Sequence, residues 1–438
     1  MSSPGKFIFK YYIFDSTLKT LELKYEFDGG MEFTETYYFD FTFASYDDNQ
    51  LARALEHLLL IAGVSYFKAY VPDKIEISKG SLTSEEAEFY SKTYEMGLGE
   101  FWYVNKLDPK TKISFPVSSS SKKPIEGGAH EGLLVGIGGG KDSLVTVEAL
   151  KRANQEFMTW SLNHRQQLEP LIKTIGSHHA YVERTIDPRL LELNDQGAYN
   201  GHVPFSAILA SVGVVVAILS GKRDVVVSNE QAANEPTLKY QGVDINHQYS
   251  KSQQFERDFQ KLVKNAYGDS IRYYSFLRPL SELYIAEIFA KLGFDKYKSV
   301  FSSCNRAYTL HSDHMFWCGE CPKCAFVFMI LTPFIERKKL EALWGGKNLL
   351  LDPSLVETYK NLLGISGEKP LDCVGEIKEV RAAMRMCFKT YPELEKEYEF
   401  DLPGDYDYKA LAKSEMPSDI QKVFDEFMAS QASPKLST

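Results

Sequence analysis

The sequence predicts an α/β protein whose parallel sheet is flanked by an N-terminal α+β domain and a C-terminal helical region. Three observations support this prediction. Between residues 133 and 228, short apolar runs alternate with stretches of helical pattern, as is typical of βαβ units. Before residue 45, aromatic and polar residues alternate in the manner of antiparallel strands. After about residue 349 the chain is helical in pattern, acidic and punctuated by proline.

The central segment, which we place at residues 130–345, carries the strand-and-helix pattern. Its predicted elements are, in order, strand Leu133–Ile137, helix Ser143–Asn154, strand Phe157–Leu162, helix Leu168–Gly176, strand Tyr181–Glu183, an apolar helix within Val203–Gly221 and strand Asp224–Ser228. Continuous apolar strands separated by helices indicate a parallel sheet covered on both faces. Because ligands bind beyond the carboxyl ends of such strands, the residues directly after each strand are the first candidates for a site.

The flanking segments are predicted as separate units. Residues 1–120 read as an N-terminal α+β domain, with strands over Phe7–Phe43 and helices at Asn49–Ala62 and Thr83–Met96. The stretch Val117–Gly132 is rich in Ser, Gly and Lys and has little to bury, so it predicts a linker. Residues 346–438 form the C-terminal helical region, in which we find no chemical motif.

Composition and charge exclude several classes of protein. The 438 residues include 59 Asp and Glu against 50 Lys and Arg, a net charge of −9, which argues against a nucleic-acid partner because such a partner requires a positive field. The nineteen uncharged residues Val203–Gly221 meet the length of a membrane span, but Pro204 and several serines favour a buried helix, so we expect no membrane insertion. Lys10 and Asp15 interrupt the apolar N-terminus, so we expect no signal peptide and a cytoplasmic location.

A glycine loop, Gly138–Ser143, directly follows the first predicted strand of the central segment and opens a helix. Three successive glycines allow backbone N–H groups to approach a phosphate, and the helix N-terminus adds a partial positive charge. A P-loop would need Ser or Thr where Asp142 stands, and a dinucleotide fingerprint would need Gly where Lys141 stands. A plain strand-to-helix turn is the alternative that assigns the loop no chemistry.

The glycine loop resembles the PP-loop of the ATP pyrophosphatases, whose pattern is Ser-Gly-Gly-x-Asp-Ser after the first strand of a parallel sheet. The match covers Gly139, Gly140, Asp142 and Ser143, and the departure is at Gly138, where the family usually has Ser. The resemblance implies an adenine nucleotide alpha hydrolase-like fold and cleavage of ATP between its α- and β-phosphates. It assigns nucleotide binding to Gly138, Gly139, Gly140 and Ser143, a catalytic role to Lys141 and Asp142, and Mg²⁺ to Asp142.

All six cysteines lie after residue 300, and four of them form the pattern C-x13-C-x2-C-x2-C: Cys304, Cys318, Cys321 and Cys324. Four soft thiolates at this spacing suit a closed tetrahedral Zn²⁺ site. An iron–sulfur cluster, redox-active pairs and buried free thiols remain alternatives. The pairing of such a cluster with a PP-loop is similar to the deazaguanine nitrile synthases, which implies a structural zinc. Cys373 and Cys387 are expected to be ordinary core or surface residues.

Polar clusters between these motifs supply the remaining candidates. They are NGHVP with His202, SNE with Asn229 and Glu230, HQYSKS with His247 and Lys251, LRPLSEL with Arg278, and FSSCNRA with Arg306. Taken with GGGKDS, CGECPKC, AGVSYFKA and GLGEF, this ordered set resembles the UDP-N-acetylmuramoyl-L-alanyl-L-glutamate epimerase family from about Leu58 to Gly345. That family converts the terminal L-Glu of a nucleotide-linked muramyl dipeptide to D-Glu and consumes ATP to AMP and diphosphate.

The resemblance implies roles that follow a simple chemical logic. An α-proton beside a carboxylate is hard to remove, and adenylation neutralises the carboxylate so that a side-chain base can take the proton. The base is open among His247, Lys251, His202 and Glu230, with Cys304 a further candidate if it binds no metal. The nucleotide-binding set also includes Asn229, and the anionic substrate is assigned to His202, Arg278 and Arg306, the arginines because their fork suits carboxylate and phosphate.

Two other functions remain open at this stage. One is another PP-loop adenylating enzyme, similar to the deazaguanine nitrile synthases or acting on tRNA, which the acidic net charge disfavours. The other is a nucleotide-sensing protein without turnover, against which the intact Lys141-Asp142-Ser143 argues. The role of the N-terminal domain and a homodimeric state are also open.

Overall fold

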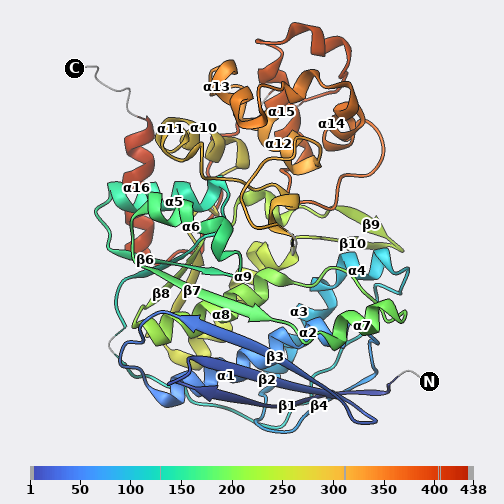
Figure 1. Ribbon diagram of the computed structural model, residues 1–438, viewed down its shortest axis with the longest axis vertical. Coiled ribbons are helices and arrows are strands. Elements are labelled where there is room, and N and C mark those ends of the chain that lie inside the picture. The colour runs from blue at the N-terminus through green and yellow to red at the C-terminus, as the bar shows by residue number, and fades with distance from the viewer. Residues whose placement is uncertain (1–3, 129, 310–311, 403, 405, 433–438) are drawn as a thin grey trace.

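The computed structural model describes residues 4–128, 130–309, 312–402, 404 and 406–432, so the parts of the predicted domains and linker that fall on residues 1–3, 129, 403, 405 and 433–438, and on residues 310–311 of the central segment, lie outside it. A nine-stranded sheet in the order β11-β8-β5-β6-β7-β3-β2-β1-β4 runs through the described chain. Helices pack on both of its faces (Figure 1). The predicted α/β class is therefore confirmed.

Five neighbouring strands of this sheet are parallel: β11 (Arg272–Ser275), β8 (Asp224–Val227), β5 (Leu133–Gly136), β6 (Phe157–Leu162) and β7 (His179–Thr185). The chain runs outward from β5 to β7 and then returns to place β8 on the other side of β5. At such a reversal of strand order, open α/β sheets bind ligands beyond the carboxyl ends of the two central strands, and we call this location the crevice. The glycine loop follows β5 and the SNE segment follows β8, so the topology brings both to this crevice.

The crossover helices are α5 (Lys141–Arg152), α6 (Arg165–Ile175), α7 (Arg189–Asp195), α8 (Phe205–Ser220) and α9 (Gln253–Tyr267). Of these, α5, α6 and α8 are close to their predicted positions. Helix α8 is buried along most of its length, as its uncharged sequence predicts. Among the described residues, no helix has both the length and the apolar character that a membrane crossing requires.

The N-terminal strands join the same sheet. Strands β1 (Lys6–Asp15), β2 (Thr20–Phe27) and β3 (Met31–Asp40) form an antiparallel meander, and β4 (Lys74–Ile77) runs parallel to β1. Strand β3 then pairs antiparallel with β7. The first 120 residues therefore share one continuous sheet with the central segment, and the boundary that we place in the linker stays a prediction.

Two hydrophobic cores lie on opposite faces of the sheet. Along β5, Leu133 and Val135 belong to one core and Leu134 to the other, as the alternation of side chains along a strand requires. The second core includes the aromatic N-terminal strands and the helices α1 (Asp48–Ala62), α2 (Val64–Phe67), α3 (Ser84–Gly97) and α4 (Gly99–Val104). The N-terminal half thus packs against one face of the strands whose carboxyl ends form the crevice.

The first core continues into the C-terminal part of the chain. Its helices are α10 (Glu282–Leu292), α11 (Phe294–Tyr297), α12 (Pro322–Leu331), α13 (Arg337–Glu341), α14 (Val356–Leu362), α15 (Ile377–Cys387) and α16 (Ser418–Ala432). In its described part, the region after residue 345 contains helices and no strand. Figure 1 shows α12 to α15 gathered at the end of the molecule opposite the blue N-terminal strands.

Short elements complete the fold. A two-stranded ribbon consists of β9 (Leu238–Tyr240) and β10 (Val243–Ile245). The 3₁₀ helices are η1 (Gln231–Asn234), η2 (Tyr249–Lys251), η3 (Asn305–Tyr308), η4 (Ala342–Trp344), η5 (Leu349–Leu351), η6 (Pro353–Leu355) and η7 (Pro392–Lys396). Several of them lie in the loops that carry the predicted site residues.

Candidate active site

Two glycines of the glycine loop differ sharply in their surroundings. Gly139 has a φ of +91°, and a Cβ there would lie 1.8 Å from the hydroxyl of Tyr308. Its carbonyl accepts a hydrogen bond from the N–H of Ser302 at 3.0 Å. A Cβ on Gly138, in contrast, would meet no atom within 4 Å. Packing therefore requires glycine at 139, whereas position 138 faces open space.

The glycine loop delivers the N-terminus of α5 to the crevice. Gly140 is the N-cap and has no side chain to bond the first helical N–H groups. These groups have no partner within the helix, and they carry the positive end of the helix dipole. Ser143 donates from Oγ to the Gly140 carbonyl at 3.3 Å, which closes the turn. The geometry suits a phosphate group.

Lys141 is buried and bonded to two carboxylates. Its Nζ lies 2.5 Å from Asp142 Oδ1 and also contacts Glu282 at the start of α10. Burial alone would lower the pKa of Lys141, but the two carboxylates outweigh it and raise the pKa above its ordinary value. The side chain of Asp142 is 28% exposed against 4% for Lys141. Asp142 is therefore the member of this pair that is open to a metal ion.

A further buried acid, Glu379 in α15, lies close to Glu282 and Lys141. It accepts a hydrogen bond from the N–H of Leu283 at 2.8 Å. Burial and the charge of Glu282 raise the pKa of Glu379 to about 8. Neither Glu282 nor Glu379 can be recognised from the sequence, because a single Glu in a helical stretch carries no local signal of burial.

The SNE segment after β8 lies against the same crevice. Ser228 Oγ lies 2.8 Å from Thr146 Oγ1, which ties the end of β8 to α5. The Asn229 carbonyl accepts from Ser275 Oγ at 2.6 Å. Glu230 is buried, and its charge acts on both Lys251 and Glu282. The structure thus groups Glu230 and Lys251 with the glycine loop.

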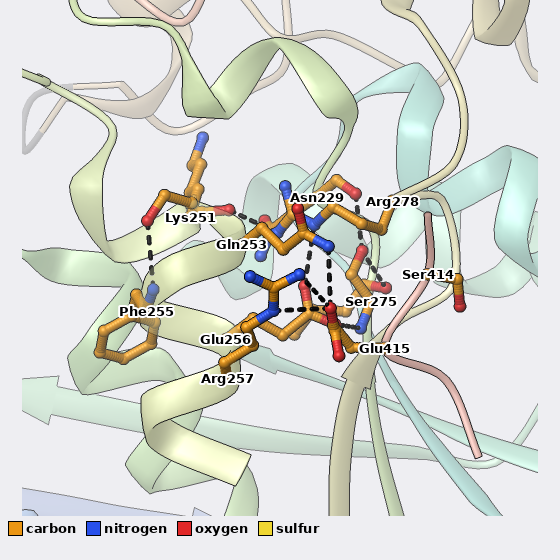
Figure 2. A network of polar contacts seen from close by, with 12 residues as sticks. Asn229, Lys251, Gln253, Phe255, Glu256, Arg257, Ser275, Arg278, Ser414 and Glu415 are labelled. Carbon is orange, nitrogen blue, oxygen red and sulfur yellow. Dashed lines mark hydrogen bonds and ion pairs between the residues drawn. The ribbon is translucent and has the colours of Figure 1, made fainter. Parts of the chain in front are cut away.

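Arg278 is buried and contacts the backbone of two of these residues. It is 1% exposed, and its Nε bonds Glu256 Oε2 at 2.8 Å. Its other nitrogens donate to the carbonyls of Glu230 at 2.6 Å and Lys251 at 2.5 Å. Figure 2 shows the side chain of Lys251 extending away from this network. The arginine therefore positions the backbone of two candidates, and its contact with substrate stays a prediction.

His202, which lies just before the start of α8, is close to His247 and to the carboxylate of Glu100. Glu100 Oε2 lies 3.5 Å from His202 Nδ1 and contacts His247 Nδ1, and the two imidazole centroids are 4.6 Å apart. Burial, together with the nearby charge of His247, lowers the pKa of His202 to about 4. Burial opposes charge on His247, but Cys373 and Glu100 outweigh it and raise its pKa to about 9. At neutral pH the pair holds one neutral and one charged ring.

Cys373 joins this group and is therefore not the ordinary core or surface residue that its sequence surroundings predict. Lys251 Nζ donates to its sulfur at 3.0 Å, and His247 lies close enough to act on the pKa of its thiol. Burial would raise the pKa of the thiol, but the charges of Lys251, His247 and Lys323 outweigh it and lower the pKa to about 6. We call Glu100, His202, His247, Lys251 and Cys373 the His–Lys–Cys cluster. No spacing rule links these positions, so sequence alone offers no signal for Cys373.

The four predicted metal ligands come together. Their sulfur atoms all lie within 4.8 Å of one another, with 4.0 Å between Cys304 and Cys321 and 3.7 Å between Cys318 and Cys324. A tetrahedron with Zn–S bonds of about 2.3 Å has edges of about 3.8 Å, so the donor set fits such an ion. Each of the six cysteines is free of a disulfide. The identity of the metal stays a prediction.

Loops from this four-cysteine site contact both parts of the crevice. The N–H of Cys304 donates to Ser302 Oγ at 3.1 Å, and Ser302 in turn holds Gly139. Lys323, between two of the cysteines, donates from Nζ to the carbonyl of Cys373. The four-cysteine site therefore supports the glycine loop on one side and the His–Lys–Cys cluster on the other.

Arg306 is placed differently from the other candidates. Its side chain is 56% exposed and pairs with Glu320 at 2.5 Å, next to the four-cysteine site. Its role in substrate binding stays a prediction. Glu100, His202 and His247 also form a group with metal-binding atoms within 4.8 Å, but the direct contacts of the carboxylate with both rings account for that group without an ion.

Comparisons with known proteins identify the family. A family model described as the MurL N-terminal domain matches residues 1–276, and one described as the MurL C-terminal domain matches residues 300–397. A protein of Xanthomonas oryzae pv. oryzae named UDP-N-acetyl-alpha-D-muramoyl-L-alanyl-L-glutamate epimerase is 40% identical over 84% of this chain and 83% of its own length.

Two further relatives carry the same name. The protein of Salinispora tropica is 37% identical over 87% of this chain and 84% of its own length. That of a Micromonospora species is 37% identical over 77% of this chain and 75% of its own length. The resemblance inferred from the ordered motifs is thus confirmed, and the chain belongs to the MurL epimerase family.

Proposed function

We propose that this chain converts the terminal L-Glu of UDP-N-acetylmuramoyl-L-Ala-L-Glu to D-Glu and consumes ATP to AMP and diphosphate, in the synthesis of a peptidoglycan precursor. The observation that carries the proposal is the meeting, at one crevice, of an anion-binding loop and a group of acids and bases. The names of the relatives supply the substrate. A nucleotide-linked substrate of this kind accords with a cytoplasmic location, which stays a prediction, as does a homodimer.

The glycine loop would bind the phosphates of ATP. The unpaired N–H groups at the start of α5 suit the diphosphate leaving group, and Asp142 is exposed enough to hold Mg²⁺. A bound Mg²⁺ would neutralise phosphate charge during the displacement. Lys141, held by Glu282, keeps its positive charge near the same phosphates. These roles support the assignment of the loop as a PP-loop.

The His–Lys–Cys cluster would handle the proton. The α-hydrogen of glutamate is acidic enough to remove only once adenylation has neutralised its carboxylate. Charged Lys251 can then stabilise the negative charge that develops on the carbonyl oxygen. Reprotonation on the other face and hydrolysis of the adenylate by water give D-Glu and AMP. ATP consumption is thus explained in a reaction whose product is only an epimer.

The four-cysteine site would hold a structural zinc ion. Four protein thiolates complete a tetrahedron and leave no open position for water or substrate. Its contribution to the reaction would be positional, through Ser302 and Lys323. No observation in the structure favours the alternative adenylating functions over the epimerase.

The direct test is incubation of the purified chain with ATP, Mg²⁺ and UDP-N-acetylmuramoyl-L-Ala-L-Glu. We expect equal release of AMP and diphosphate, and chiral analysis after acid hydrolysis is expected to show D-Glu. Asp142→Asn should lower AMP release by at least about 100-fold because it removes the charge that holds the metal. Asp269→Asn, at an exposed position remote from the crevice, is the matched control. Absence of AMP with this substrate, or AMP release that requires tRNA instead, would refute the proposal.

A further inference from the structure

Resting on the proposed function, we propose that the thiolate of Cys373 is a catalytic base that removes the α-proton of the adenylated glutamate on one face. The loop that carries Cys373 lies between η6–α14 and α15, far in sequence from the motifs of the family resemblance. Its sulfur nevertheless lies 3.0 Å from Lys251 Nζ, within the His–Lys–Cys cluster. The inference rests on this juxtaposition.

The position of Cys373 links the proton chemistry to the nucleotide. Lys251 is close enough to Asp142, Glu230 and Cys373 for all three charges to act on it. Lys251 therefore connects the carboxylate proposed to hold Mg²⁺ with the sulfur proposed to take the proton. None of the other cysteines is available for this role. Four of them form the four-cysteine site, and Cys387 lies fully buried in α15.

The remaining members of the cluster are poorer bases. Lys251 and His247 are held in their charged forms by the groups around them, so neither is free to take a proton at neutral pH. His202 is neutral, but its low proton affinity makes it a weak base. A thiolate flanked by two cations is largely ionised at neutral pH, and the proton affinity of Cys373 is higher than that of His202.

The backbone of Cys373 is held in place. Lys323 donates to its carbonyl, and the preceding residue, Asp372, accepts a hydrogen bond from Asn305 of η3. Both partners belong to the segments that carry the four-cysteine site. A fixed backbone keeps the sulfur at the distance that proton transfer requires.

The step balances without a further reagent. The Cα–H bond of the glutamyl adenylate breaks, an S–H bond forms on Cys373, and the electron pair moves to the carbonyl oxygen to give an enolate. Water supplies the proton that reaches Cα from the opposite face, and the thiol returns its proton to solvent. Cys373 and Lys251 are too close together to bracket a carbon atom, so both serve the same face.

The test separates adenylation from proton transfer. Cys373→Ala and Cys373→Ser are incubated with ATP, Mg²⁺ and UDP-N-acetylmuramoyl-L-Ala-L-Glu in D₂O. We expect AMP release within about threefold of the unmodified chain, while D-Glu formation falls by about 10²–10⁴-fold, the usual contribution of a general base. The recovered L-Glu should contain no deuterium at Cα. Cys387→Ala is the matched control and should epimerise normally.

The outcomes are distinguishable from failure of the proposed function. If the unmodified chain releases no AMP, the proposed function fails. If it is active and Cys373→Ala epimerises within tenfold of it, only the present inference is overturned.

A second measurement decides the matter if both variants lose adenylation through misfolding. The unmodified chain is treated with iodoacetamide, and each cysteine is followed by mass spectrometry. We expect Cys373 to react faster than Cys387, ATP with substrate to protect it, and the alkylated protein to release AMP while forming no D-Glu. Epimerisation that survives full alkylation of Cys373 would overturn the inference.

Discussion

The glycine loop and the His–Lys–Cys cluster face one crevice but are built in opposite ways. The loop is six consecutive residues, and its binding groups are backbone N–H donors whose direction is set by one turn. The cluster draws side chains from four separate segments, around Glu100, His202, His247 with Lys251, and Cys373. Phosphate binding can thus be encoded locally, whereas a proton-transfer group must be assembled by the whole fold.

The largest effect is expected from the loop. Gly139→Ala would push a Cβ into the hydroxyl of Tyr308 at a φ that disfavours alanine, so the loop must shift. A displacement of this size can cost about 100-fold in rate. We expect AMP release to fall by at least that factor, measured with saturating ATP. Gly138→Ala, which meets no neighbour, should retain AMP release and the same Tm. Equal activity of the two variants would contradict the packing argument.

An intermediate effect is expected from the four-cysteine site, which touches both regions. Cys321→Ser should remove the metal, measured by inductively coupled plasma mass spectrometry, and lower the Tm. Because Ser302 and Lys323 brace the loop and Cys373 respectively, AMP release and D-Glu formation should both fall. A metal-free variant with normal rates for both steps would show that the site braces neither region. Cys387→Ala serves as the control without a ligand role.

The smallest effect is expected from Arg306, which lies outside both regions. Its exposed pair with Glu320 contributes little to folding, so Arg306→Ala should leave the Tm unchanged. If it binds the nucleotide sugar, the KM for that substrate should rise about threefold to tenfold at unchanged kcat. Arg337→Ala, another exposed arginine in an ion pair, is the control. A change in kcat without a change in KM would remove Arg306 from the binding set.

The sequence was sufficient for the βαβ part of the fold, because its strands and helices are local patterns. Strand Leu133–Gly136 and helix Lys141–Arg152 lie within a residue or two of their predicted bounds. The joining of the N-terminal meander to β7 could not be predicted, since the pairing of Tyr38 with Glu183 leaves no mark on either segment alone.

The same limit applies to the site. The order of motifs located Asp142, Glu230 and Lys251 because each follows a strand or begins a helical segment. Sequence shows that Arg278 is charged, but only the structure shows that Glu256 and two carbonyls already occupy it. Cys373 carried no pattern at all, and its chemistry comes from Lys251 and Lys323, which lie 122 and 50 residues away in the sequence.

The pairing of β3 with β7 also affects how the chain folds during its synthesis. Residues 31–40 leave the ribosome well before residues 179–185, their hydrogen-bonding partners. Until β7 emerges, β3 is the open edge of an aromatic-rich meander, and such edges pair readily with other chains. Nascent chains shorter than about 180 residues are therefore the ones that most need a chaperone, and interrupted synthesis should yield aggregates rather than a folded N-terminal fragment.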